Sequence, residues 1–128
     1  MDPASEVALT IPAEPSHVVL ARAATSAVCA QADFTVDRLD DLRLAVDEAC
    51  ALVIADAPPD SQLHVHLSVS GSHVTIEVRG TSRKGMPVAT NTFAWTVLTA
   101  LVDEVETSVE AGQLCIRLQA DGIESVAL

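Results

Sequence analysis

The sequence predicts an α/β two-layer sandwich, in which a mostly antiparallel mixed sheet carries three helices on one face. Several short stretches alternate apolar and polar residues, as strands covered on one side do, and three longer stretches repeat apolar residues at spacings of three and four. The element order is strand, helix, helix, two strands, loop, helix and two strands, which leaves too few crossovers for a doubly wound parallel sheet. Because 49% of the 128 residues are hydrophobic, we expect residues 1–128 to form a single domain.

The N-terminal part of the chain predicts one strand and one helix. Residues 6–11 alternate in character, so we expect a strand with one face toward the core, near a sheet edge. A helix is expected over residues 16–32, because Pro15 suits a first turn, where its missing N–H costs nothing. The apolar stripe of this helix comprises Val18, Ala21, Thr25 and Val28.

A second helix is predicted to begin near Val36, with Thr35 as its N-cap, and to stop at Pro58. From residue 49 to residue 57 the side chains are apolar almost all round, so we expect this half of the helix to be buried under the sheet. Asp56 is the exception in that stretch. The apolar repeat of the helix comprises Leu39, Leu42, Val46, Ala49 and Val53.

The next elements are a hairpin, a loop and a third helix. The hairpin is expected to turn at Gly71-Ser72. The pairs that this turn creates are His66 with Glu77 and His64 with Arg79, and a one-residue slip would change both.

Residues 80–91 lack apolar periodicity and predict a long, mobile loop. A helix over residues 92–103, capped by Asn91 or Thr92, has Phe93, Val97 and Leu101 along its apolar side. A closing hairpin is predicted to turn at Ala111-Gly112.

Acidic residues outnumber basic ones in this chain. Eighteen Asp and Glu residues against seven Lys and Arg residues give a net charge of −11. Such a chain repels nucleic-acid phosphates and anionic lipid, so we expect no direct binding to nucleic acid or to a membrane. A basic protein surface would instead be attracted to it.

The cysteines and the N-terminus indicate a cytoplasmic protein. Cys29, Cys50 and Cys115 are odd in number and include no C-x-x-C pair, which predicts free thiols in a reducing setting. Cys29 and Cys50 are expected in the core, whereas Cys115 alternates outward and is a candidate reactive thiol. The N-terminus lacks the basic residues of a signal peptide, and no apolar run approaches the roughly 20 residues that a membrane span needs.

Two histidines raise the question of a metal site. His64 and His66 share one face of a predicted strand, but no third ligand lies nearby in sequence. Two histidines on an exposed strand face without a third ligand are more often solvated than metal-bound, and we expect no metal site.

Two stretches carry a resemblance to a known family. They are L-R-L-A-V-D-E-A-C-A-L-V-I-A-D-A in the second helix and V-L-T-A-L-V-D-E-V-E-T at the end of the third. With them the chain resembles RsbW-type anti-sigma factors and serine kinases of the GHKL superfamily, which also includes histidine kinases and gyrase-type ATPases. It is similar in particular to the actinobacterial RsbW (UsfX-like) regulators of a stress sigma factor. The resemblance covers nearly the whole chain and implies a Bergerat-type, GHKL-like fold, with the element order given above.

The nucleotide motifs of the family are degenerate in this chain. In the family, Glu-x-x-x-Asn on the second helix supplies a Glu that helps to activate a hydroxyl and an Asn that binds Mg²⁺; here Glu48 matches the Glu and Leu52 replaces the Asn. Gly80 stands where the family has an Asp that contacts adenine, and Thr92 and Ala94 replace phosphate-binding glycines. We therefore expect no bound cofactor, with ATP and Mg²⁺ as the alternative. Glu48 is either a residual catalytic position or a partly exposed helix carboxylate.

Three basic residues are candidates for partner binding. In the family, an arginine at the position of Arg22 contacts the sigma factor, although a nearby acidic position of the family is Val18 here. Arg83 and Lys84, with Arg79 beside them, belong to the predicted loop. They either keep a mobile segment soluble or remain from the family's ATP lid and touch an acidic partner.

Three hypotheses follow for the function. The first is an anti-sigma factor, a homodimer as in the family, that sequesters an alternative sigma factor and is released by an anti-anti-sigma factor with a STAS domain. The second is an ATP-dependent serine kinase of that anti-anti-sigma factor, against which the missing Asn and Asp argue. The third is an interaction module for some other regulatory protein.

Overall fold

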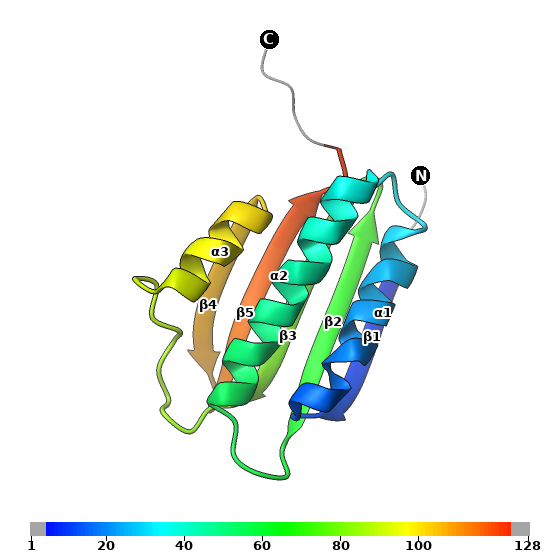
Figure 1. The fold of residues 1–128 in the computed structure, drawn as a ribbon. Coiled ribbons are helices and arrows are strands. Elements are labelled where there is room, and N and C mark those ends of the chain that lie inside the picture. The colour runs from blue at the N-terminus through cyan, green and yellow to red at the C-terminus, as the bar shows by residue number, and fades with distance from the viewer. Residues whose placement is uncertain (1–4, 124–128) are drawn as a thin grey trace.

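The computed structural model describes residues 5–123, which form two layers (Figure 1). One layer is a five-stranded sheet, and the other holds three helices on one face of that sheet. The strands are β1 (Ser5–Pro12), β2 (Gln62–Ser70), β3 (His73–Thr81), β4 (Glu104–Glu110) and β5 (Gln113–Asp121). The helices are α1 (Val18–Cys29), which follows the 3-10 turn η1 (Pro15–His17), α2 (Val36–Ala55) and α3 (Phe93–Leu101). The predicted two-layer sandwich is confirmed.

Within residues 5–123 the strand order is β1-β2-β3-β5-β4, and every neighbouring pair is antiparallel. The expectation of a mixed sheet is therefore wrong. β3 and β4 do run in the same direction, as the crossover through α3 dictates, but β5 lies between them. β1 and β2 are joined by two helices, which return the chain in the opposite direction. As predicted, β1 lies at an edge of the sheet.

The local predictions for turns and caps hold. The β2–β3 hairpin turns at Gly71-Ser72, and its register pairs His66 with Glu77 and His64 with Arg79. The β4–β5 hairpin turns at Ala111-Gly112, where both residues have positive φ, 51° and 76°. The Thr35 hydroxyl caps α2 by accepting from the Arg38 N–H at 3.2 Å.

The core lies between the helices and the inner face of the sheet. Alternate residues of β2, β3 and β5 are buried there, as are Leu42, Val46, Ala49 and Val53 of α2. The C-terminal half of α2 is buried on one side only, because Ala51 and Ala55 are exposed. A helix in the outer layer of a two-layer sandwich always keeps one side toward solvent. No helix among residues 5–123 is both long enough and apolar enough to cross a membrane.

The apolar side predicted for α3 is wrong. Phe93 is 84% exposed, and the buried residues of α3 are Trp95 and Leu98. Apolar residues occur on every side of this helix, so its sequence does not single out the face toward α2 and the sheet. The Thr92 hydroxyl caps the helix by accepting from the Trp95 N–H at 3.2 Å, which confirms Thr92 as the N-cap.

Candidate functional site

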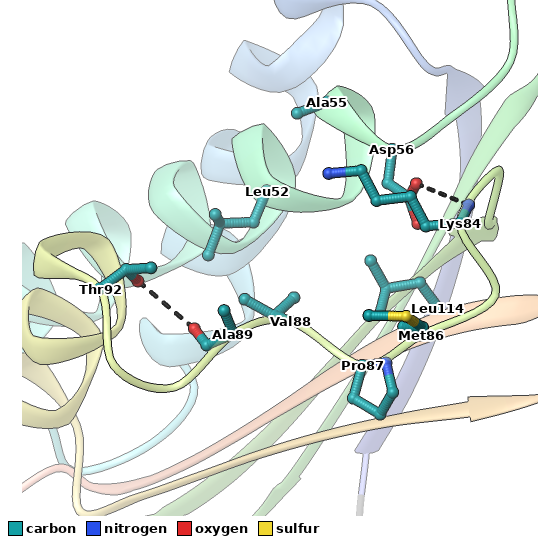
Figure 2. A pocket seen from close by; sticks show the side chains of 10 residues that line it. All are labelled: Leu52, Ala55, Asp56, Lys84, Met86, Pro87, Val88, Ala89, Thr92 and Leu114. Atoms are coloured by element: carbon teal, nitrogen blue, oxygen red, sulfur yellow. Dashed lines mark hydrogen bonds between the residues drawn. The ribbon is translucent and has the colours of Figure 1, made fainter.

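A cavity of about 260 Å³ lies between the C-terminal end of α2, the connecting segment 82–92 and β5 (Figure 2). Its walls are mainly carbon, contributed by aliphatic side chains from all three elements. Asp56, Lys84 and Thr92 are the residues in the lining with polar side chains. The complete lining is Leu52, Ala55, Asp56, Lys84, Met86, Pro87, Val88, Ala89, Thr92 and Leu114.

The structure brings two of the degenerate motif positions together at this cavity. Leu52 and Thr92 both line it, from α2 and from the start of α3, whereas Gly80 and Ala94 do not. Gly80 is buried in β3, and a Cβ added there would lie 2.8 Å from Cγ1 of Val53. Val53 is a buried, β-branched residue of α2 and has little freedom to move aside. A carboxylate therefore cannot be placed at Gly80 without shifting the helix.

Glu48, the matched member of the helix motif, is half-buried on α2, one turn before Leu52. It does not line the cavity. The neighbouring position toward the cavity is the apolar side chain of Leu52, which has no oxygen for a metal ion.

Asp56 is a residue whose role the sequence did not indicate. It is 7% exposed and follows the last residue of α2. One carboxylate oxygen accepts from the Ser82 hydroxyl at 2.5 Å. The other accepts from the Lys84 N–H at 3.1 Å, as Figure 2 shows. The Asp56 carbonyl oxygen accepts from the Arg83 N–H at 2.8 Å. We call this group, Asp56 with residues 82–84, the Asp56 clasp.

The Asp56 clasp holds the first residues of segment 82–92 in place. The segment contains no helix or strand, as predicted, but the expected mobility does not fit its first residues, which are tied to α2. The Ser82 N–H also donates to the Gly112 carbonyl at 2.9 Å, and the Val88 N–H donates to the Thr107 hydroxyl at 3.1 Å. Three elements of the fold thus hold the wall of the cavity.

The charge state of Asp56 follows from these contacts. Burial alone would raise its pKa, but the hydrogen bonds from Ser82 and Lys84, with the Lys84 charge nearby, hold the pKa of Asp56 below its ordinary value. Asp56 is therefore ionised at neutral pH, and its carboxylate oxygens are engaged in these hydrogen bonds.

The three basic residues near the loop lie in different places. Arg83 is exposed, Lys84 lines the cavity, and Arg79 lies on the outer face of the sheet, where it pairs with Glu77 at 2.9 Å. Arg79 therefore does not share a surface with Arg83 and Lys84, beside which the sequence places it. Strand alternation sends the side chain of Arg79 to the face opposite the helices, together with that of Glu77.

Arg22 occupies a second concave region, between α1 and α2. Its Nε lies 3.1 Å from an oxygen of Asp47, and both side chains are partly exposed, at 43% and 33%. The two atoms are not aligned as a hydrogen bond, although each is shielded from solvent. Burial raises the pKa of Asp47, and the charges of Arg22 and Arg43 lower it by less. The rest of this groove, of about 450 Å³, is apolar and includes Val18 and Ile54.

The outer face of the sheet is polar and open. His64 lies 3.1 Å from the Thr10 hydroxyl, and within residues 5–123 no cluster of three metal-ligating side chains occurs.

Cys29 and Cys50 are buried, as predicted, and burial raises their pKa values to about 11 and about 12. Burial also raises the pKa of the outward-facing Cys115, which disfavours the thiolate form on which the reactivity of a cysteine depends.

The sequence of this chain matches a known protein family over most of its length. Residues 11–120 match the family described as Histidine kinase-like ATPase domain, and the chain belongs to that family.

Over 101 residues the chain is 36% identical to proteins of Mycobacterium tuberculosis named anti-sigma-F factor RsbW, a match that covers 79% of this chain and 60% of theirs. It is 37% identical over 54 residues to the serine-protein kinase RsbW of Bacillus velezensis, which covers 42% of this chain and 34% of that protein. A crystal structure of RsbU and RsbW domains from M. tuberculosis has the same fold, with a TM-score of 0.73 over 91% of this chain and 32% of that chain, at 16% identity. The chain thus spans about 60% of the length of its mycobacterial relatives.

Proposed function

We propose that this chain is an anti-sigma factor, which sequesters an alternative, stress-response sigma factor in the cytoplasm. The observation that carries the proposal is the apolar groove between α1 and α2, which Arg22 lines beside Asp47. The family resemblance implies that an arginine at this position contacts the sigma factor. The 36% identity with proteins named anti-sigma-F factor supports the same function.

The chemistry of the groove suits a mixed apolar and charged contact. Arg22 keeps 43% of its side chain exposed, so a partner carboxylate can reach it beside Asp47. Val18, at the position where the family has an acid, makes the adjoining surface apolar. The chain as a whole, at net charge −11, attracts the basic DNA-contacting surfaces of a sigma factor. Charge then speeds the encounter, and the apolar groove lengthens the lifetime of the complex.

Arg22→Glu is expected to weaken sigma-factor binding by about thirtyfold, which corresponds to the loss of one interface hot spot of roughly 2 kcal/mol. Binding by the unmodified chain should also weaken as salt is raised, because screening removes the long-range attraction. Titration calorimetry at several ionic strengths measures both effects. Arg117→Glu is the matched control, since it makes the same charge change on the outer face of the sheet at similar exposure. Equal losses in the two variants would show that Arg22 makes no specific contact with the sigma factor, and no sigma binding by the unmodified chain would refute the proposal.

We further infer that release runs through competition by a STAS-domain protein at segment 82–92. Between Gly80 and Val102 the sequence contains Arg83 and Lys84 but no carboxylate, in a chain that is otherwise acidic. Met86, two residues after Lys84, is 63% exposed, and Phe93, the first residue of α3, is 84% exposed. An exposed apolar surface with a basic rim suits an acidic protein partner.

Nucleotide plays no part in this mechanism. Leu52 offers no ligand to Mg²⁺, Gly80 has no room for a carboxylate, and both oxygens of Asp56 are already engaged. Loss of the adenine carboxylate alone removes a charge-assisted hydrogen bond of roughly 1.5 to 3 kcal/mol.

Addition of the STAS protein is expected to free the sigma factor without ATP, and Mg-ATP should bind weakly or not at all. Calorimetry with Mg-ATP, a phosphoryl-transfer assay and a sigma-release assay test this prediction together. Micromolar ATP binding with phosphoryl transfer to the STAS protein, both lost in Glu48→Ala, would instead establish the kinase. If affinity purification recovers a regulatory protein other than a sigma factor, the chain is an interaction module of a different kind.

We also propose that the chain is a homodimer that pairs through β1. This strand is an edge of the sheet and carries a single charged residue, Glu6, with Val7 38% exposed. The other edge, β4, carries three glutamates, which disfavour pairing with a second copy. Light scattering should give twice the chain mass, and Val7→Lys should shift it to one chain mass. A monomer at all concentrations up to tens of micromolar, roughly the range for a weak interface, would contradict dimerisation.

A further inference from the structure

We propose that the cavity between α2 and segment 82–92 is a binding site for a small amphipathic monocarboxylate, a molecule with an apolar body and one anionic head. This inference rests on the lining of the cavity and is independent of the proposed sigma-factor binding. Two of the degenerate nucleotide-motif positions, Leu52 and Thr92, line the cavity, but its walls are mainly apolar.

The walls favour an apolar body of limited size. Leu52, Val88 and Leu114 come from three separate elements and present aliphatic carbon to the same space (Figure 2). The volume of about 260 Å³ is slightly below the range of roughly 300 to 1,000 Å³ that is usual for small-molecule sites. A ligand that fills it is therefore smaller than a nucleotide and largely hydrophobic.

Of the polar side chains in the lining, those of Asp56 and Thr92 already have hydrogen-bond partners in the protein, which leaves the charge of Lys84 for a ligand. Both carboxylate oxygens of Asp56 accept hydrogen bonds within the Asp56 clasp. The Thr92 hydroxyl accepts from the Trp95 N–H and donates to the Ala89 carbonyl at 3.4 Å. Lys84, by contrast, makes no ion pair within 4.0 Å among residues 5–123. Its ammonium group extends back over the cavity, toward Leu52 and Ala55 (Figure 2).

The position of Lys84 sets the place and the charge of the head group. Lys84 and Asp56 lie at one end of the cavity, and Thr92 lies at the other (Figure 2). The anionic head thus binds at the end away from α3, and the apolar body extends toward Thr92. Because the ionised Asp56 is close by, a singly charged carboxylate is favoured over a doubly charged phosphate ester.

A chain-length series of carboxylates, from butyrate to decanoate, tests the proposal on the isolated protein. Affinity is expected to rise about fourfold with each added methylene until the cavity is filled, and then to stop rising. Trp95 is the only tryptophan of the chain and lies one helical turn after Thr92, so its fluorescence reports binding without a label. Chemical-shift changes at Leu52, Val88 and Leu114 would place the ligand in the cavity.

Three variants and a neutral ligand separate this site from unspecific binding. Lys84→Met keeps the backbone N–H of the Asp56 clasp and should lower octanoate affinity at least tenfold, with octanol binding unchanged. The matched control is Arg83→Met, which removes an adjacent charge outside the lining and should change neither ligand. Ala89→Phe should fill the cavity and abolish binding of both. The proposal is overturned if octanoate fails to bind at millimolar concentration, if affinity ignores chain length, or if the two charge variants behave alike. None of these outcomes bears on sigma-factor capture.

Discussion

Gly122→Ala is expected to lower the free energy of unfolding by about 3 kcal/mol or more, a large part of the roughly 5 to 15 kcal/mol that keeps a domain folded. A Cβ at Gly122 would collide with the carbonyl group of Asp33 and the ring of Phe34. The main chain of Asp33 cannot turn aside as a flexible side chain can. The substitution must therefore push β5 away from the residues that lead into α2.

The backbone of Gly122 also joins three parts of the fold. Its N–H donates to the Ser72 carbonyl at 2.7 Å, in the turn between β2 and β3. Its carbonyl accepts from the N–H of Thr35 at 3.0 Å, and Thr35 is the N-cap of α2. Displacement of Gly122 would weaken both contacts, which adds to the cost of the collision.

Urea unfolding followed by circular dichroism measures this effect. Gly85→Ala is the matched control, because a Cβ at Gly85 meets nothing within 4 Å and only the positive φ of 68° is unfavourable there. That strain costs about 1 kcal/mol. A loss at Gly122 no larger than the loss at Gly85 would show that the chain end can move aside at little cost.

Asp56→Ala is expected to lower the free energy of unfolding by about 3 kcal/mol, because two hydrogen bonds to a buried carboxylate are lost and their donors remain. The donors are the Ser82 hydroxyl and the Lys84 N–H. The same change should also release the first residues of segment 82–92, so amide hydrogen exchange at residues 83–85 should become faster. A double-mutant cycle with Ser82→Ala isolates the carboxylate–hydroxyl contact, with an expected coupling of about 1 kcal/mol or more. Additive losses would show that the two side chains do not stabilise each other.

The contribution of Asp56 should depend on pH in a defined direction. Because its pKa is lower in the folded chain, its stabilising effect is complete above the ordinary Asp pKa of about 3.9 and is lost as pH falls through the lower folded value. The difference in unfolding free energy between the unmodified chain and Asp56→Asn should thus be constant from pH 5 to pH 7 and shrink below about pH 4. A difference that grows as pH falls would mean that the folded state raises the pKa of Asp56.

Sequence alone determined the features that depend on near neighbours in the chain. The turns at Gly71-Ser72 and Ala111-Gly112 fixed both hairpin registers, because a two-residue turn leaves one pairing for the strands that it joins. The caps Thr35 and Thr92 were predictable for the same reason, since a capping hydroxyl bonds an N–H only three residues away. The family resemblance added the positions of Glu48 and Arg22, which patterns of hydrophobicity do not reveal.

The alternation of β3 also separates Arg79 from the basic residues of the loop. Arg79 lies two residues after Glu77, so strand geometry places both side chains on one face, opposite the residues that pack against α2. Lys84 lies beyond the end of the strand, where this alternation no longer applies. The spacing of residues in the sequence is therefore sufficient to assign Arg79 to the outer face of the sheet.

Tertiary structure decided the rest, because the deciding contacts join residues far apart in the chain. α3 has apolar residues on every side, and its packing against α2 and the sheet decides that Trp95 and Leu98 are buried and Phe93 is exposed. Asp56 looked like an interruption in an apolar helix, yet it holds a segment that begins 26 residues later. No sequence pattern indicates a role for Gly122, which the fold packs against Asp33. A carboxylate or a glycine has the same local pattern whether it is solvated or packed, and the fold alone supplies the neighbour that gives it a role.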